Sequence, residues 1–360
     1  MAARGQSAPG GVAFHYAAVF PPAAAEWYSR FGMLVTGGIL SKEQTAALRP
    51  GPKLIAYEWS SGFYPGDAVS AALDWQKQAL AHPDWLLTKD PVGGAAAEGG
   101  KTAHWYDFGS GELIEARARH LARLLAESGY DGFFFDTPGL EHIPPAAKAS
   151  FESRHDRADY NALQGLFLKT LRHTLPAAKI IFLNQGYRHA DHMLPYAGYD
   201  LTESYFTYAD PKLGTGFRPW HDPARPWESI KTPLEQLILK PAAKYPLVRF
   251  VHLNYAAGAP ELTARALRYS HAGVHIFGHT PYLVVPEDWR RETGDVYFHS
   301  LGKPLAARYV EEPGGVVWRA YENGVVALNG GSKPARIPAG DLPEPMQGYL
   351  FAKPAGTPRR

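Results

Sequence analysis

The hydrophobic pattern of the chain is clearest at Gly132–Asp136, where three phenylalanines stand at consecutive positions. Both faces of this segment are therefore expected to be buried, as in a parallel strand that is covered by helices. The segment ends in the carboxylate of Asp136, and the chain turns directly afterwards through Thr137, Pro138 and Gly139. The carboxyl end of a buried parallel strand is where α/β barrels and open α/β sheets carry out chemistry.

Strand patterns alternate with helical patterns from about residue 12 to residue 282. Eight strands are predicted, at Val12–Ala17, Met33–Gly37, Lys53–Glu58, Gly132–Asp136, Lys179–Asn184, Asp200–Glu203, Val248–Asn254 and Val274–Gly278. Helical patterns separate them, and the third helix is expected to stop at Gly129. This count predicts an α/β fold of the (β/α)₈ TIM barrel type, with a doubly wound open sheet as the alternative.

After residue 282 the alternation stops. An Asn-Gly turn joins Val316–Tyr321 to Val325–Leu328 in a predicted hairpin, and further strands are predicted at Asp295–His299 and Gln347–Ala352. We therefore expect a disordered N-terminal segment (1–11), a catalytic barrel (12–290) and a small C-terminal antiparallel β module (291–354). Two long loops, from Glu58 to about Ser110 and from Glu203 to about Lys231, are expected to wall a cleft.

Composition limits the classes of function. Hydrophobic residues make up 45% of the 360 residues, and a net charge of +2 without a long basic run argues against nucleic acid as a partner. The chain has no cysteine, which excludes disulfides and zinc–thiolate sites. No stretch approaches the roughly 20 apolar residues that span a bilayer. Residues 1–11 lack the apolar core of a signal peptide; we expect a secreted or periplasmic protein, with any signal peptide absent from this sequence. The oligomeric state is not indicated.

Every predicted strand ends in polar or titratable side chains. In chain order these are His15-Tyr16, Thr36, Tyr57-Glu58, Asp136, Asn184-Gln185, Glu203, Asn254-Tyr255 and His279. A barrel built only for stability does not need such a ring, so we predict an active site at the carboxyl ends of the strands. Asp131 and Asp200 begin strands and are expected to cap turns at the opposite rim.

Asp136 and Glu203 are the strongest acids in this ring. Glycoside hydrolysis requires at least two carboxyl groups beside the bond that is cleaved. Asp136 follows a stiff strand and is predicted to be the nucleophile, whereas Glu203 precedes an aromatic loop and suits a proton donor. Glu58 competes for one of these roles. The predicted substrate-binding residues are His15, Tyr16, Tyr57, Glu58, Asn184, Tyr205, Asn254 and Tyr255.

Other chemistries fit the sequence less well. The chain has no His-Glu-x-x-His motif, no Gly-x-Gly-x-x-Gly or Walker-type loop and no Gly-x-Ser-x-Gly elbow. His189, Asp191 and His192 could ligate a metal, but they fall in a predicted surface helix. We therefore expect no cofactor and no metal. A catalytically inactive barrel that binds glycans through its aromatic loops is the main alternative, and a metal-dependent hydrolase is a further one.

Three segments resemble a known family. They are Gly129–Asp136, Ile180–Gly186 and Leu201–Ser204, and they resemble the endo-α-1,4-polygalactosaminidase family of glycoside hydrolases and the related Pel-polysaccharide hydrolase domains. The resemblance implies a TIM barrel that cleaves a microbial exopolysaccharide rich in partly deacetylated amino sugar, without a metal. It also implies catalytic acids at Asp136 and Glu203. This chain departs from the family at Thr137-Pro138-Gly139, where a second acidic residue often stands.

Overall fold

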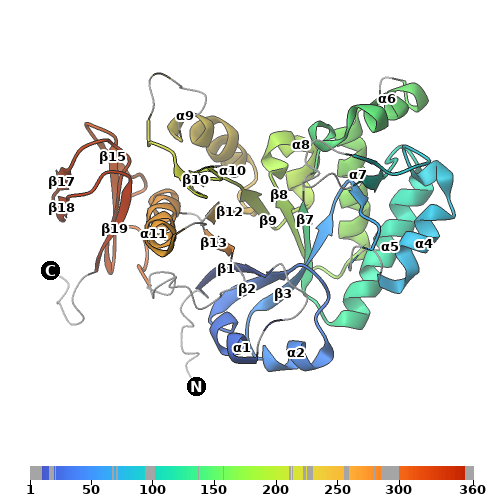
Figure 1. Ribbon diagram of the computed structural model, residues 1–360, viewed down its shortest axis with the longest axis horizontal. Helices are drawn as coiled ribbons and strands as arrows, with labels where there is room; N and C mark the ends of the chain where they lie inside the picture. The colour runs from blue at the N-terminus through green and yellow to red at the C-terminus, as the bar shows by residue number, and fades with distance from the viewer. Residues whose placement is uncertain are drawn as a thin grey trace.

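Eight parallel strands close into a barrel in the computed structural model (Figure 1). The strands are β1 (Gly10–His15), β2 (Phe31–Thr36), β3 (Lys53–Trp59), β7 (Gly132–Asp136), β8 (Ile180–Asn184), β9 (Tyr199–Thr202), β12 (Arg249–Asn254) and β13 (Thr280–Val284). β1 pairs in parallel with both β2 and β13, which closes the sheet. The predicted TIM barrel is thereby confirmed over the open-sheet alternative.

The structure describes most of the chain. The described residues are 10–15, 20, 22–66, 69, 72–93, 102–136, 138–156, 158–210, 212, 214–221, 224, 230–254, 259–278, 280–284 and 300–352. The predicted segment 1–11 lies almost wholly outside these residues, as do the predicted boundary at 290/291 and the predicted strand Asp295–His299.

Seven of the eight strand predictions agree with the structure to within two residues, and the eighth is wrong. Residues 274–277 belong to the helix α11 (Pro260–Phe277), which ends at Gly278 with φ 73°. Strand β13 begins only after this turn, so His279, which is not a described residue, precedes the strand instead of ending it. The helix also continues through Gly273, where a Cβ atom would lie 2.4 Å from the ring of Phe206. Glycine at this position therefore serves helix packing.

Side chains alternate between the inside of the barrel and the layer under the helices. The inner cluster consists of Val12, Phe14, Met33, Val35, Ile55, Phe134, Ile180, Phe182, Leu201 and Val251. Because successive strand residues face opposite sides, Tyr57, Asp136, Asn184 and Glu203 follow the inner residues by two positions. The strand period therefore directs these four polar side chains to the inner side, at the carboxyl ends of neighbouring strands.

Helices cover the outside of the barrel (Figure 1). They are α1 (Pro22–Tyr28), α2 (Lys42–Ala47), α4 (Trp75–Leu80), α5 (Gly111–Ser128), α6 (Pro145–Arg154), α7 (Tyr160–Thr174), α8 (Ala190–Met193), α9 (Lys231–Pro233), α10 (Lys240–Lys244) and α11. Ser110 caps α5 by accepting a hydrogen bond from the Leu113 N–H, and Gly129 ends this helix with φ 73°, as predicted. Within the described residues, no helix has the length and apolar character needed to cross a membrane.

The two long loops contain secondary structure of their own. The first carries β4 (Gly62–Phe63), β5 (Val92–Gly93) and β6 (Thr102–Trp105), which form a three-stranded antiparallel sheet beside α4. The second carries the short pair β10 (Thr207–Tyr208) and β11 (Gly216–Phe217). Both segments leave from the carboxyl ends of barrel strands, so they extend the barrel at the predicted active-site face.

The C-terminal β module is a four-stranded antiparallel sheet of β14 (Val310–Glu312), β15 (Val316–Tyr321), β16 (Gly324–Asn329) and β19 (Gln347–Ala352), with a hairpin of β17 (Ala335–Ile337) and β18 (Gly340–Leu342). The predicted Asn-Gly hairpin is confirmed as β15–β16. The sheet lies against α11 (Figure 1), and the buried Arg319 donates to the carbonyl of Ile276.

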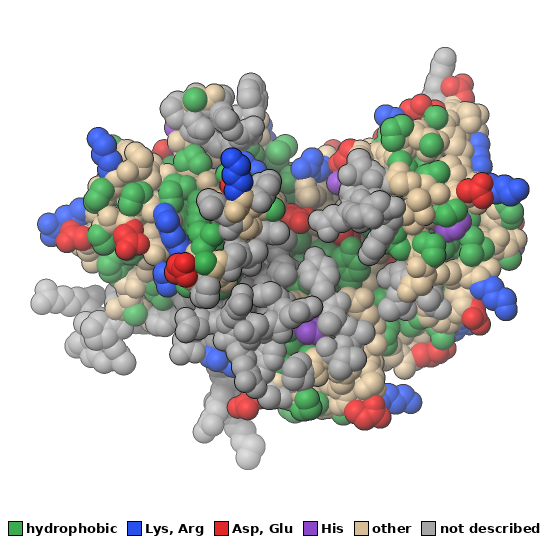
Figure 2. All heavy atoms as spheres, viewed as in Figure 1, with side chains coloured by type: hydrophobic (Ala, Val, Ile, Leu, Met, Phe, Trp, Pro, Cys, Tyr) green, Lys and Arg blue, Asp and Glu red, His purple; other side chains and the backbone are tan. Residues whose placement is uncertain are grey.

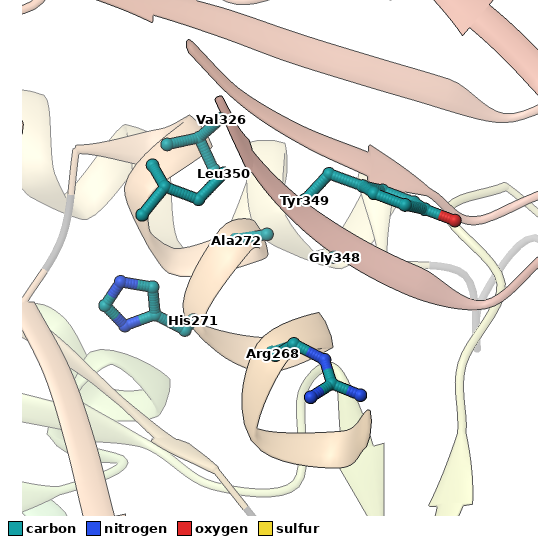
Figure 3. Close-up of a pocket in the computed structure, with 7 residues that line it drawn as sticks. All are labelled: Arg268, His271, Ala272, Val326, Gly348, Tyr349 and Leu350. Carbon is teal, nitrogen blue, oxygen red and sulfur yellow. The ribbon is translucent and has the colours of Figure 1, made fainter. Parts of the chain in front are cut away.

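A small cavity of about 40 Å³ lies between α11 and this sheet, lined by Arg268, His271, Ala272, Val326, Gly348, Tyr349 and Leu350 (Figure 3). It can hold a few water molecules but not a sugar ring.

Candidate active site

Asn184 joins the two predicted catalytic acids. Its Nδ2 donates one hydrogen bond to Oδ1 of Asp136, at 2.6 Å, and another to Oε2 of Glu203, at 3.0 Å. The three residues come from the ends of β7 and β8 and from the position directly after β9, which are consecutive strands of the barrel. The structure therefore brings Asp136, Asn184 and Glu203 together in one site.

Tyr57 holds the other oxygen of Asp136. Its hydroxyl donates to Oδ2 of Asp136 at 2.6 Å, and its ring packs against Phe14 and Phe134 inside the barrel. Asp136 thus accepts a hydrogen bond on each carboxylate oxygen, from two side chains on neighbouring strands. This arrangement fixes the orientation of the carboxylate.

The separation of the two acids follows from the shared amide. Oδ1 of Asp136 and Oε2 of Glu203 lie no farther apart than the sum of their two distances from Nδ2 of Asn184. That sum is below the separation of about 6.5–9.5 Å that leaves room for a water in inverting glycosidases. The bound applies to this one pair of oxygens, and it agrees with the shorter separation of about 5–5.5 Å between the carboxyl groups of retaining enzymes.

The backbone is strained next to this site. Gln185 and Ser204, which directly follow Asn184 and Glu203, have φ values of 61° and 55°. Residues other than glycine rarely adopt this left-handed conformation, and such strain clusters at functional sites. Gly139, with φ 119°, lies in the turn after Asp136, and its N–H donates to Oε1 of the buried Gln164. The chain therefore turns sharply after each of the three residues.

Glu58 does not join the cluster, although it was predicted to bind substrate or to compete for a catalytic role. Its side chain is 1% exposed and forms an ion pair of 2.9 Å with Arg117, which is 0% exposed. Arg117 lies on α5 and also donates to the carbonyls of Trp59 and Ser60. Glu58 is one position beyond Tyr57 on β3, so it points to the helix layer instead of the inner side.

Two further predicted residues are occupied elsewhere. Nδ1 of His15 forms a hydrogen bond of 2.7 Å with the hydroxyl of Tyr28 on α1, in a cluster with the ring of Phe20. The hydroxyl of Tyr205 donates to the carbonyl of Ile230, and burial raises the pKa of this phenol. Tyr16 and Tyr255 lie outside the described residues, and so does the side chain of Asn254.

Sequence reasoning missed Glu141 and His142 in the turn after β7, and it considered His189 in the turn after β8 only as a metal ligand. Burial lowers the pKa of His142, and the charges of Glu141 and Asp136 oppose this shift. Nε2 of His189 forms a hydrogen bond of 2.8 Å with Oε2 of Glu141, which links the two turns. The polar pair Glu141-His142 directly after the Gly139 turn was the signal that could have identified them.

Tyr187 lies close to the acids as well. Burial raises the pKa of its phenol, and the charges of Asp200 and Glu203 act in the same direction.

In Figure 2 the surface is hollowed between the side that carries α9 and α10 and the side that carries α6 and α8, with acidic and histidine side chains at the hollow. Among the described residues, no three His, Asp or Glu side chains are grouped closely enough to hold a metal ion.

Comparisons with known proteins show the fold class but no family. No protein-family model matches the chain, and no curated protein sequence matches it. Solved structures do match. An α-amylase from Geobacillus thermoleovorans, complexed with acarbose, is 11% identical, with 96% of each chain covered and a TM-score of 0.53.

Two other structures match in the same way. A maltogenic α-amylase from Thermotoga neapolitana is 11% identical over 90% of this chain and 86% of that chain, with a TM-score of 0.54. An α-amylase from Malbranchea cinnamomea is 8% identical over 91% of this chain and 86% of that chain, with a TM-score of 0.51. The chain thus has the barrel fold of these glycoside hydrolases together with C-terminal antiparallel strands. At such low identity this likeness concerns the fold alone.

Proposed function

We propose that the protein is a retaining glycoside hydrolase that cleaves a polysaccharide, with Asp136 as nucleophile and Glu203 as general acid and base. The observation that carries this proposal is the amide of Asn184, which donates to both carboxyl groups and holds them close together. A retaining mechanism needs such a short separation. A barrel fold shared with solved glycoside hydrolases supports the same conclusion.

The reaction has two steps. Glu203 gives its proton to the glycosidic oxygen while a carboxylate oxygen of Asp136 attacks the anomeric carbon, so the carbon–oxygen bond to the leaving sugar breaks and a glycosyl ester forms. Water then enters, Glu203 takes its proton, and the hydroxide displaces Asp136 from the anomeric carbon. Tyr57 and Asn184 hold Asp136 in one orientation through both steps. The sugar leaves with the configuration it had in the polymer.

The proposed substrate is a microbial exopolysaccharide that contains amino sugar, which is what the resemblance at Gly129–Asp136, Ile180–Gly186 and Leu201–Ser204 implies. The carboxylates of Asp136 and Glu141 give the site negative charge that suits a protonated amine on the sugar. The same carboxylates would repel an acidic polysaccharide.

The test is to incubate the protein with α-1,4-linked galactosamine oligosaccharides, their N-acetylated forms and maltooligosaccharides, and to measure reducing ends. Asp136→Asn and Glu203→Gln are each expected to abolish hydrolysis of the substrate that the parent cleaves. Activity that survives both substitutions would contradict the proposal. A parent protein that binds one of these glycans without ever cleaving it would instead support the alternative of a glycan-binding barrel.

A further inference from the structure

Asp200 is a buried acid to which the proposed mechanism gives no part. It lies on β9 and is 0% exposed. The sequence prediction that Asp200 caps a turn at the opposite rim is wrong, because the stagger of the barrel sets Asp200 beside Leu183 of β8, one residue before Asn184. A residue near the start of one strand therefore lies at the end of its neighbour.

Both oxygens of Asp200 bind the turn that follows Asn184. Oδ1 accepts from the N–H of Gly186 at 2.7 Å, and Oδ2 accepts from the N–H of Tyr187 at 2.8 Å. These two donors begin the 3₁₀ turn Gly186–His189, and Gln185 before them has φ 61°. Burial raises the pKa of Asp200, and the backbone N–H groups that it binds oppose this rise because they stabilise the charged form. The carboxylate thus holds the chain in the sharp turn that Gln185 makes directly after Asn184.

Gly186 is adapted to this contact. A Cβ atom at this position would lie 2.7 Å from Cδ1 of Leu183 and 3.1 Å from Oδ1 of Asp200. A larger residue would therefore push the carboxylate away from the N–H that it binds. Glycine at position 186 therefore allows the carboxylate of Asp200 to approach the backbone closely.

We propose that Asp200 is a positioning residue: it fixes the turn after β8, and through that turn it orients the Asn184 amide between Asp136 and Glu203. This inference rests on the proposed function, in which those two carboxylates must be held at a set distance. Asparagine cannot replace Asp200, since in either orientation its NH₂ group would face one of the two backbone N–H groups. A misplacement of about 1 Å in a catalytic site can lower the rate by about 100-fold.

The experiment compares Asp200→Asn with Asp131→Asn on the substrate that the parent cleaves. Asp131 is the matched control, because its Oδ2 also accepts a backbone N–H, that of Leu54, but it lies before β7 at the other end of the barrel. We expect D200N to lower kcat by about 10–100-fold with KM within about threefold, whereas D131N keeps the parent kcat. Equal kcat in D200N and the parent would overturn the inference.

Gly186→Ala keeps Asp200 but crowds its carboxylate, so it should also lower kcat. It replaces D200N as the test variant if D200N does not fold.

A second readout is independent of turnover. The side-chain amide of Asn184, assigned by ¹⁵N NMR through its absence in Asn184→Ala, is expected to shift in D200N and G186A but not in D131N. An unchanged amide resonance in both test variants would overturn the inference even if the parent cleaves no substrate. Asp136→Asn separates the two proposals: hydrolysis that survives D136N refutes the proposed function, whereas an inactive D136N beside a fully active D200N refutes only the role of Asp200.

Discussion

The side-chain nitrogen of Asn184 lies 2.6 Å from Oδ1 of Asp136, which makes an uncharged amide the immediate neighbour of the proposed nucleophile. The same nitrogen donates to Glu203. A single planar group therefore sets the distance between the two acids.

Replacing Asn184 is expected to remove the group that holds Asp136 and Glu203 together. Asn184→Ala removes two hydrogen bonds to carboxylates, each worth about 1.5–3 kcal/mol. We expect kcat/KM to fall by at least about 10–100-fold, and the melting temperature to fall as well, because the same two hydrogen bonds stabilise the folded protein. Steady-state kinetics and calorimetry measure the two quantities, and a variant with parent-like kcat/KM would contradict the role of Asn184.

Tyr57→Phe tests the contact on the other oxygen of Asp136. The ring contacts with Phe14 and Phe134 remain, and only the hydrogen bond to Oδ2 is lost. We expect a loss in kcat/KM of about tenfold, corresponding to one hydrogen bond to a charged group, together with a lower urea midpoint because the same bond stabilises the folded protein. If Tyr57 were merely a packing residue, Y57F would leave kcat/KM unchanged.

The Glu58–Arg117 ion pair is expected to matter for stability and not for catalysis. Both side chains are buried, and removing one partner leaves an uncompensated charge, which costs about 3–5 kcal/mol of unfolding free energy. Arg117→Met and Glu58→Gln should each lower the urea midpoint strongly while the folded protein keeps its kcat. A Glu58→Gln variant with normal stability but lost activity would instead support the sequence prediction that Glu58 acts on the substrate.

Stability should also depend on pH through His120. This buried side chain stacks on Trp75, and burial, followed by the charges of Arg117 and Arg123, lowers its pKa from 6.5 to about 4. In the unfolded chain His120 takes up a proton near pH 6.5, whereas in the folded protein it does so only at about pH 4. The contribution of His120 to the free energy of unfolding is therefore complete above pH 6.5 and is lost as the pH falls from 6.5 to about 4. The slope is about 1.4 kcal/mol per pH unit, so the total loss is about 3 kcal/mol.

Urea unfolding between pH 7 and pH 4 measures this loss. His120→Phe should flatten the dependence relative to the parent, whereas His173→Phe, at an exposed position near the end of α7, should not. Identical pH profiles for the parent and H120F would show that His120 does not titrate as expected.

The strand rhythm of the sequence was sufficient to predict the barrel and to place Asp136, Asn184 and Glu203 at strand ends. Asp136 and Asn184 follow apolar segments whose burial on both faces is visible in the sequence, although Asn184 was predicted only as one of several substrate-binding residues. The direction of a side chain at a strand end was not visible, since both faces of β3 are apolar and the sequence does not distinguish Tyr57 from Glu58. Only the structure shows that Tyr57 faces inward and Glu58 faces α5.

The register between strands was equally hidden. Asp200 could be placed at the end of β8 only from the stagger of the barrel, which no local pattern in the sequence encodes. The misplaced eighth strand has a local cause: Val274, Ile276 and Phe277 are apolar and close together, which suits a short strand as well as the buried last turn of a helix. The close packing of the Phe206 ring against Gly273 favours the helix at these residues.

Trapping of the glycosyl–enzyme intermediate tests the central claim most directly. The protein is incubated with a 5-fluoro glycosyl fluoride of the sugar whose oligomer it cleaves fastest, digested, and analysed by mass spectrometry. The expected result is one adduct, carried by the peptide that contains Asp136 and absent in D136N. Cleavage with inverted anomeric configuration and no adduct, or an adduct on a different acid, would contradict a retaining mechanism built on Asp136 and Glu203.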